Sequence, residues 1–146
     1  MVDDLVPRQV AAAIQESIGL FTRQLRQAPV GGELTFSELL ALGRLERVGS
    51  ATTSDLARAE QITPQAMGAT LAALEERGLV QRRPDAGDGR RVLMSMTRAG
   101  DRALQSRRDA RTEQMARVLE NRFTRAEMRA LMTAAPLIER LGEGLW

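Results

Sequence analysis

The feature that most constrains the fold is a short segment, residues 79–100, in which two β-forming stretches flank a turn rich in glycine, aspartate and arginine. The β-forming side chains lie in residues 79–83 and 91–96, and residues 85–90 form the turn, so the segment predicts a β-hairpin with a cationic tip. A charged hairpin can be a mere solvated loop. Whether the hairpin belongs to a functional motif therefore depends on the elements that precede it.

A helix-turn-helix pattern precedes this hairpin. The capping signature of residues 52–55 opens a short helix over residues 55–60. Thr63 then supplies a helix N-cap and Pro64 a first helical position, which together predict a longer helix over residues 65–77. Helix, turn, longer helix and hairpin in this order make a winged helix, an architecture that mostly binds DNA.

The rest of the chain is predicted to be helical. No internal repeat, low-complexity tract or linker divides it, so residues 1–146 are expected to form a single domain, mainly α with a small β-hairpin wing. The further expected helices cover residues 7–27, a segment from the Thr35–Glu38 capping box to near Gly49, a long helix from Thr97 to about Asn121, and a last helix that begins at the Thr124–Glu127 capping box.

The composition excludes several classes of function. Cysteine is absent, which removes disulfides, thiolate catalysis and cysteine-based redox sensing. Histidine, lysine and tyrosine are absent too, so only carboxylates and hydroxyls remain for catalysis, and neither an enzyme nor a cofactor or metal site is expected. There is no apolar stretch of membrane-spanning length and the N-terminus, Met1–Asp4, is acidic, so we expect a cytoplasmic protein without a membrane partner.

The distribution of charge favours a polyanionic partner. All 21 basic residues are arginine, and the net charge is only +2. Residues 82–111 hold nine arginines and four acidic residues, so this stretch is strongly cationic while the remainder is acidic. Such polarisation predicts that one face of the molecule meets a polyanion, although charge runs on helices are usually solvated faces.

Several motifs together carry a family resemblance that covers nearly the whole chain. They are residues 63–67, 74–80, 82–85, 88–90 and 95–100. In these the chain resembles the MarR family, the multiple-antibiotic-resistance type of winged-helix repressor. The resemblance implies a homodimer whose terminal helices, about residues 5–28 and 98–146, form a platform. Two winged-helix units, about residues 34–97, would then bind the two half-sites of a palindromic operator in double-stranded DNA.

The predicted recognition helix departs from the family pattern. Met67, Leu71 and Leu74 form its expected buried stripe. Ala69 stands where family members often have a long polar residue, and Gly87 replaces a charged residue in the wing. Since few long side chains are left to reach bases, we expect specificity to depend on DNA shape and on the wing.

Candidate DNA contacts on this helix lie near its N-terminus. Gln65 can pair bidentately with adenine in the major groove. Thr63, Pro64 and the free amides of the same turn can hold a phosphate. Gly68 and Ala69 would allow a close approach to thymine methyl groups.

The hairpin carries the remaining candidate DNA contacts. The resemblance places Arg90 at the wing tip, where a guanidinium can enter a narrow minor groove. Asp88 is expected to pair with Arg90 and fix its direction. Arg82, Arg83 and Arg91 are expected to be phosphate contacts or salt-bridge partners.

Two further sets of residues are expected to serve the dimer and a ligand. The apolar side chains expected at the dimer interface are Val10, Ile14, Met128, Leu131, Met132, Ile138, Leu141 and Leu145. A pocket for a small anionic aromatic effector is the use suggested for Phe21, Phe36, Arg107, Arg108, Arg111 and Met115. The simpler alternative is that these arginines form salt bridges and that the apolar side chains belong to the core.

The function predicted by these observations is sequence-specific DNA binding by a homodimeric transcriptional regulator, a repressor by the resemblance. The alternative is a winged-helix module without an effector that coats DNA without sequence preference or docks a protein. A salt titration separates the two, because only a sequence-specific protein keeps a large ratio of affinities for specific and random DNA.

Overall fold

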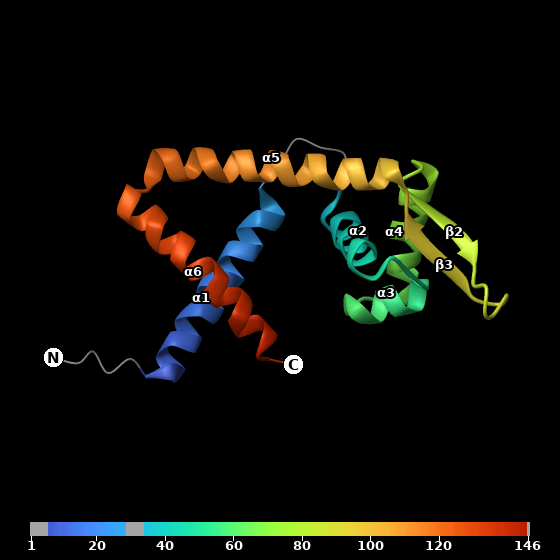
Figure 1. Cartoon of the computed structure of the whole chain (residues 1–146), viewed down its shortest axis with the longest axis horizontal. Helices are drawn as coiled ribbons and strands as arrows, with labels where there is room; N and C mark the ends of the chain where they lie inside the picture. Colours follow the sequence, from blue (N-terminus) through green and yellow to red (C-terminus); the bar gives the residue numbers. More distant parts are fainter. Residues whose placement is uncertain (1–5, 29–33, 146) are drawn as a thin grey trace.

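The computed structural model describes residues 6–28 and 34–145, which form a helical protein with one small antiparallel sheet (Figure 1). The fold class expected from the sequence is confirmed. None of the helices in these ranges is both long and apolar enough to cross a membrane. The elements are α1 (Pro7–Gln27), α2 (Phe36–Val48), β1 (Ser50–Ala51), α3 (Thr53–Ala59), α4 (Pro64–Glu76), β2 (Val80–Pro84), β3 (Val92–Met96), α5 (Arg98–Arg122) and α6 (Arg125–Glu143).

Threonine N-caps define where most of the helices begin. Each of α2 to α6 follows a threonine whose hydroxyl accepts a hydrogen bond from the backbone amide three residues later. The capping boxes predicted at Thr35–Glu38 and Thr124–Glu127 are both present. Such a cap typically stabilises a helix by about 1 kcal/mol. Most helix starts were therefore predictable from local sequence: α1 begins at Pro7 as expected, whereas α3 begins at Thr53 rather than at residue 55.

The sheet contains the predicted hairpin and one strand that the sequence analysis missed. Strands β2 and β3 pair antiparallel, with Val80 opposite Met96 and Pro84 opposite Val92. The two-residue strand β1 adds to the other edge of β3, which gives the order β1-β3-β2. A strand of two residues has no alternation to detect, so hydrophobic periodicity could not have revealed it.

The hydrophobic core lies within the winged-helix elements and the first turns of α5. Its members are Leu34, Ala41, Leu42, Leu45, Leu56, Ala57, Met67, Leu71, Leu74, Val80, Met94 and Leu104. Gly100 lets α5 approach the backbone just before β2, because a Cβ atom at this position would lie 2.1 Å from the carbonyl oxygen of Leu79. Leu104 and Gly100 therefore fix the beginning of α5 on the winged-helix elements.

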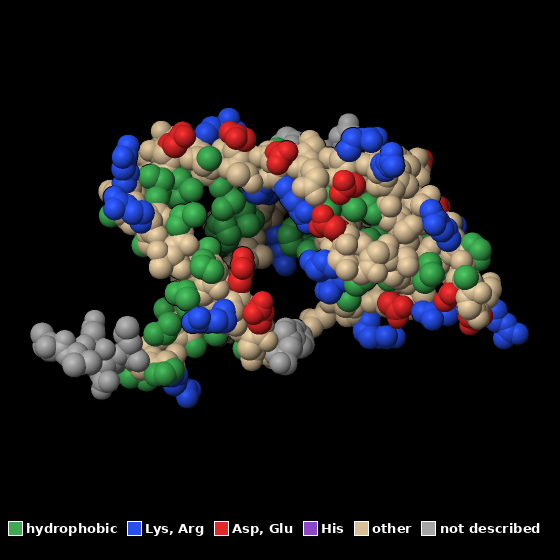
Figure 2. Space-filling view, viewed as in Figure 1, with side chains coloured by type: hydrophobic (Ala, Val, Ile, Leu, Met, Phe, Trp, Pro, Cys, Tyr) green, Lys and Arg blue, Asp and Glu red, His purple; other side chains and the backbone are tan. Residues whose placement is uncertain are grey.

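The outer helices have no such core. In the described ranges neither α1 nor α6 contains a buried residue, and α5 contains none beyond Leu104. In Figure 1, α5 runs away from the wing, and α6, which follows the far end of α5, crosses α1. Figure 2 shows hydrophobic side chains gathered over these outer helices. The exposed apolar side chains there include Val10, Ile18, Leu20, Phe21, Leu131, Met132, Leu137, Ile138, Leu141 and Leu145.

Candidate DNA-binding surface

The N-terminus of α4 presents the face predicted for recognition. The Thr63 hydroxyl accepts a hydrogen bond from the Ala66 amide at 3.1 Å, and Pro64 occupies the first turn. Met67, Leu71 and Leu74 are buried, as predicted. This packing leaves Gln65 and Ala69 exposed and Gly68 half-buried.

The exposed face of α4 carries short side chains. Gln65 is the long polar side chain of its first two turns. The hydroxyl of Thr70 donates to the carbonyl of Ala66 at 3.1 Å, so it is already engaged within the helix. Short side chains would let the backbone of α4 come close to the floor of a DNA groove. They also leave few side chains that are long enough to reach the bases.

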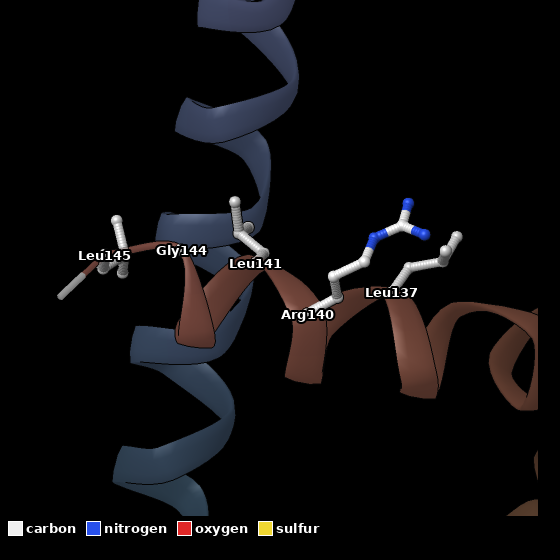
Figure 3. A pocket seen from close by; sticks show the side chains of 5 residues that line it. All are labelled: Leu137, Arg140, Leu141, Gly144 and Leu145. Atoms are coloured by element: carbon white, nitrogen blue, oxygen red, sulfur yellow. The ribbon is translucent and has the colours of Figure 1, made fainter.

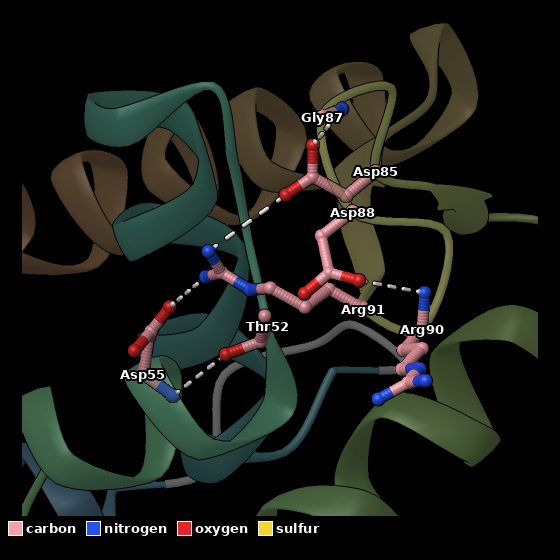
Figure 4. Close-up of polar contacts among 7 residues, drawn as sticks. All are labelled: Thr52, Asp55, Asp85, Gly87, Asp88, Arg90 and Arg91. Carbon is pink, nitrogen blue, oxygen red and sulfur yellow. Dashed lines mark hydrogen bonds and ion pairs between the residues drawn. The ribbon is translucent and has the colours of Figure 1, made fainter.

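The wing tip is shaped by two aspartates that bond to backbone amides (Figure 4). Asp85 Oδ1 accepts from the Gly87 amide at 3.0 Å, and Asp88 Oδ1 accepts from the Arg90 amide at 3.1 Å. The expected ion pair between Asp88 and the Arg90 guanidinium is not among the contacts of the described residues. Instead, the Asp88 carboxylate accepts from the backbone amide two residues later and closes an Asx turn, because a short aspartate side chain readily reaches that amide. Asp88 therefore orients Arg90 through the backbone.

Arg91 ties the wing to α3. Its Nη2 lies 3.4 Å from Asp55 Oδ2, and its Nη1 lies 3.7 Å from Asp85 Oδ2. The hydroxyl of Thr52 accepts from the Asp55 amide at 3.1 Å. The pKa of Asp55 is lowered, mainly by hydrogen bonding with the Thr52 hydroxyl and its backbone, and then by the charges of Arg91 and Arg58. Arg91 thus has the ion pairs that were one of its two expected roles, and its phosphate contact stays a prediction.

The neighbouring arginines of β2 differ from each other. Arg82 Nε contacts Glu75 Oε2 of α4 at 2.7 Å, so this residue too has an ion pair, while its phosphate contact stays a prediction. Arg83 is exposed and has no ion pair within the described residues. Arg83 and Arg90 are therefore the wing arginines whose charge is not balanced by a carboxylate of the described chain.

The cationic stretch predicted over residues 82–111 does not form one face. Its second half, from Arg98 onward, lies along α5, which leads away from the wing tip (Figure 1). Residues 34–97 hold eight arginines and eight acidic residues, so the winged-helix elements have no net charge. The sequence window joined residues that are neighbours in the chain but belong to different parts of the molecule. A DNA interface must therefore use a few well-placed arginines rather than bulk charge.

Arg58 is a candidate contact that the sequence analysis missed. It lies on α3, the first helix of the helix-turn-helix, and its side chain is 80% exposed. Its ion-pair partner is Asp55, at 3.6 Å, and the same carboxylate also pairs with Arg91. In helix-turn-helix proteins the first helix crosses the DNA backbone, so the position of Arg58 suits a phosphate contact. The available signal in the sequence was an arginine that directly follows the apolar pair Leu56 and Ala57 near the end of the predicted short helix.

The arginines suggested for an effector pocket make protein contacts. Both Nη atoms of Arg108 reach the carboxylate of Glu46, at 3.0 and 2.7 Å. Arg111 donates to the carbonyl of Leu25 at 3.0 Å and to Gln114 Oε1 at 2.8 Å. For Arg108 the salt-bridge alternative is confirmed, whereas Arg111 bonds to uncharged oxygens. The pKa of Arg111 is lowered by burial and by the neighbouring charge of Arg107.

The apolar residues suggested for that pocket are not core residues of the chain. Phe21, Phe36 and Met115 are exposed. The Arg26 guanidinium lies over the Phe36 ring at 4.5 Å. An open groove lies elsewhere, at the end of α6, where Leu137, Arg140, Leu141, Gly144 and Leu145 line it (Figure 3).

Comparisons with known proteins agree with this architecture. The family model described as MarR family matches residues 33–91. An HTH-type transcriptional regulator of Mycobacterium tuberculosis is 32% identical over 130 residues, which are 89% of this chain and 90% of the relative. An HTH-type transcriptional repressor of the same species is 34% identical over 116 residues, covering 79% and 78% of the two chains.

A solved structure extends the likeness to three dimensions. The crystal structure of a Pseudomonas aeruginosa protein described as a transcriptional regulator superposes with a TM-score of 0.75. It is 33% identical in sequence, and the match covers 92% of this chain and 94% of that one. The winged-helix order, the threonine-capped helices and these matches lead to one conclusion. The chain belongs to the MarR family of winged-helix transcriptional regulators.

Proposed function

We propose that this regulator is a repressor that binds a palindromic operator as a homodimer. The observation that carries the proposal is the wing tip, where Asp88 holds the backbone of Arg90 while the guanidinium has no ion pair in the described part of the chain. A cation held at an exposed turn, without a carboxylate to satisfy it, suits the negative potential of a narrow minor groove.

A division of labour along the chain supports the dimer. Residues of about 34–97, the proposed DNA-binding unit, contain nearly all of the core. The proposed platform, of about residues 5–28 and 98–146, leaves large apolar side chains exposed, among them Met132 at 77% and Leu145 at 76%. Exposed apolar surface this extensive is a mark of an interface, and a two-fold dimer covers it with its own copy. The groove at the end of α6 belongs to the same surface.

Exposure and position in the protomer support the proposed DNA contacts. Gln65 pairs with adenine in the major groove, and the capped N-terminus of α4 at Thr63 holds a phosphate. Arg90 enters the minor groove, and Arg83 and Arg58 contact phosphates. Because α4 has short side chains beyond its first turn, the wing and DNA shape supply much of the specificity.

The test is to enrich bound sequences from a random DNA pool and then to titrate salt against the enriched and a shuffled duplex. We expect an imperfect palindrome with half-sites about 34–36 Å apart, one helical turn. We also expect a specific affinity that exceeds the random one by a factor of at least about 10³. Failure to enrich any motif, together with equal affinity for both duplexes, would favour the architectural alternative.

Release by an anionic aromatic ligand is a second proposal that the arginines of α5 make testable. A carboxylate ligand would have to displace Glu46 from Arg108 or the Leu25 carbonyl from Arg111. Calorimetry with salicylate-like acids, followed by DNA titration in their presence, measures both binding and release. Absence of binding at millimolar concentration would leave these arginines with their structural contacts alone.

A further inference from the structure

Helix α5 connects the winged-helix elements to the outer helices (Figure 1). Its first turns are fixed to the core by Leu104. Arg108 and Arg111 follow one helical turn apart, and they hold different parts of the molecule. We call these two arginines with their acceptors, Glu46 and the Leu25 carbonyl, the α5 clamp.

The first arm of the clamp holds α2. The guanidinium of Arg108 reaches both carboxylate oxygens of Glu46, and the side-chain amide of Gln105 adds a contact to Oε1 at 3.3 Å. Leu42 and Leu45, on the same helix, are almost fully buried in the core, so the backbone of Glu46 moves with the winged-helix elements. The pKa of Glu46 is lowered mainly by its hydrogen bonds to Arg108, which shows that the pair favours the charged carboxylate. A two-pronged contact of this kind fixes direction as well as distance.

The second arm holds α1. Arg111 Nη2 donates to the Leu25 carbonyl, in the last turn of α1, where carbonyls begin to lack partners within the helix. The side chain of Gln114 accepts from Nη1 at 2.8 Å and so holds the guanidinium in place. Since α1 contains no buried residue, polar contacts such as this one orient it relative to α5.

We propose that Arg108 and Arg111 are positioning residues that set the angle between the DNA-binding unit and the dimer platform. Through this angle they fix which half-site spacing the dimer accepts. This inference rests on the proposed homodimer and its palindromic operator. Helix α5 is about 37 Å long, so a rotation of about 10° at its middle moves either end by about 3 Å. One base-pair step is a similar distance, so a loose clamp admits operators of neighbouring spacing.

The experiment measures affinity for a series of operators whose half-sites are moved apart or together by one or two base pairs. The variants are Arg108→Met, Glu46→Gln and Arg111→Met. The wild type should strongly prefer one spacing. Arg108→Met and Glu46→Gln should each reduce that preference by about fivefold, the upper range for an exposed ion pair. Arg111→Met, which removes hydrogen bonds to uncharged oxygens, should reduce it by a similar factor, as expected for about 1 kcal/mol. The control is Arg102→Met, because Arg102 lies on the same helix, is exposed, and has no ion pair among the described residues.

A charge exchange separates positioning from general loss of stability. The double variant Glu46→Arg, Arg108→Glu restores an ion pair between α2 and α5, so it should recover much of the spacing preference that either single change removes. Thermal unfolding and sedimentation verify that each variant is a folded dimer. If Arg108→Met does not fold, Arg108→Lys replaces it, since lysine keeps the charge but loses the two-pronged contact.

The outcomes of these measurements separate two failures. A wild-type protein that is monomeric, or that binds no palindrome, contradicts the proposed function itself. A wild-type dimer with a sharp spacing preference that all three variants retain contradicts the clamp and leaves the proposed function standing.

Discussion

The winged-helix elements and the outer helices are built from similar residues but are stabilised in different ways. Between Leu34 and Val80 the apolar side chains close on one another, and several of them are fully buried. In α1 and α6 the apolar side chains lie on one face, and none of them is buried in the protomer. The difference teaches that one part of the molecule carries its own core, whereas the other completes its core only against another surface.

The largest expected effect comes from an arginine placed in the platform. Leu131→Arg should convert the proposed dimer to a monomer and reduce operator affinity by at least about 100-fold, because each half-site alone supplies only part of the contacts. The winged-helix core should remain folded, since Leu131 does not contribute to it. Sedimentation measures the oligomeric state, and a duplex titration measures affinity.

A matched change in the other region makes this test specific. Val48, at the end of α2, is 52% exposed in the protomer, and Leu131 is 49% exposed. Val48→Arg therefore introduces the same charge at the same degree of exposure but away from the platform, and it should leave the dimer intact. Dissociation of the Val48→Arg protein, or a dimeric Leu131→Arg protein, would show that the two regions do not differ in this way.

The next effect concerns the wing. Arg90→Ala should weaken operator binding by at least about 30-fold, since the dimer loses the contact twice and one such contact contributes about 1 kcal/mol or more. Stability should hardly change, because the side chain is exposed and unpaired in the described chain. Thermal unfolding beside a duplex titration at physiological salt measures both. Unchanged affinity would remove the wing tip from the mechanism.

Asp88 should show a smaller and chemically selective effect. Asp88→Ala removes the acceptor for the Arg90 amide and should cost severalfold in affinity, as expected for the loss of one exposed hydrogen bond of about 1 kcal/mol. Asp88→Asn keeps a side-chain oxygen at the same place and should bind nearly as well as the wild type. If Asn behaved like Ala, the carboxylate charge would be the important property and the expected Asp88–Arg90 ion pair would form in the complex.

The extent to which the sequence anticipated these features follows the range of the interactions involved. Threonine caps, Pro64 and the buried stripe at Met67, Leu71 and Leu74 are local signals, and the helices they define were predicted. The contacts of Arg82 with Glu75 and of Arg91 with Asp55 join different elements, so the sequence left their role open. For the clamp, a salt bridge of Arg108 was an expected alternative without a named partner, and the contact of Arg111 with the Leu25 carbonyl was not predicted.

Charge illustrates the same limit. A window along the chain counted the arginines of the wing together with those of α5. The fold separates them, because α5 extends away from the wing (Figure 1). A sequence window that spans several elements can join residues that the fold separates. The net charge of such a window therefore does not give the net charge of a surface.

The smallest expected effect is the response to pH, and it concerns both regions at once. The pKa values of Asp55, beside the wing, and Glu46, in the α5 clamp, are both lowered in the folded protein. A group whose folded pKa is depressed stabilises the fold above its unfolded pKa, and that stability is lost as pH falls through the folded value. Unfolded aspartate and glutamate titrate near pH 3.9 and 4.3, about the range in which stability should begin to fall.

Above that range nothing in the side chains titrates before arginine, because the chain contains no histidine, cysteine, lysine or tyrosine. Thermal stability and operator affinity at fixed salt should therefore be nearly constant from about pH 6 to 9, apart from the terminal amine. Both are measured across that interval in buffers of equal ionic strength. A change in operator affinity of more than about threefold within it would require a carboxylate whose pKa DNA binding raises by several units. Asp55 would be the first to examine, through Asp55→Asn, since it lies beside the proposed interface.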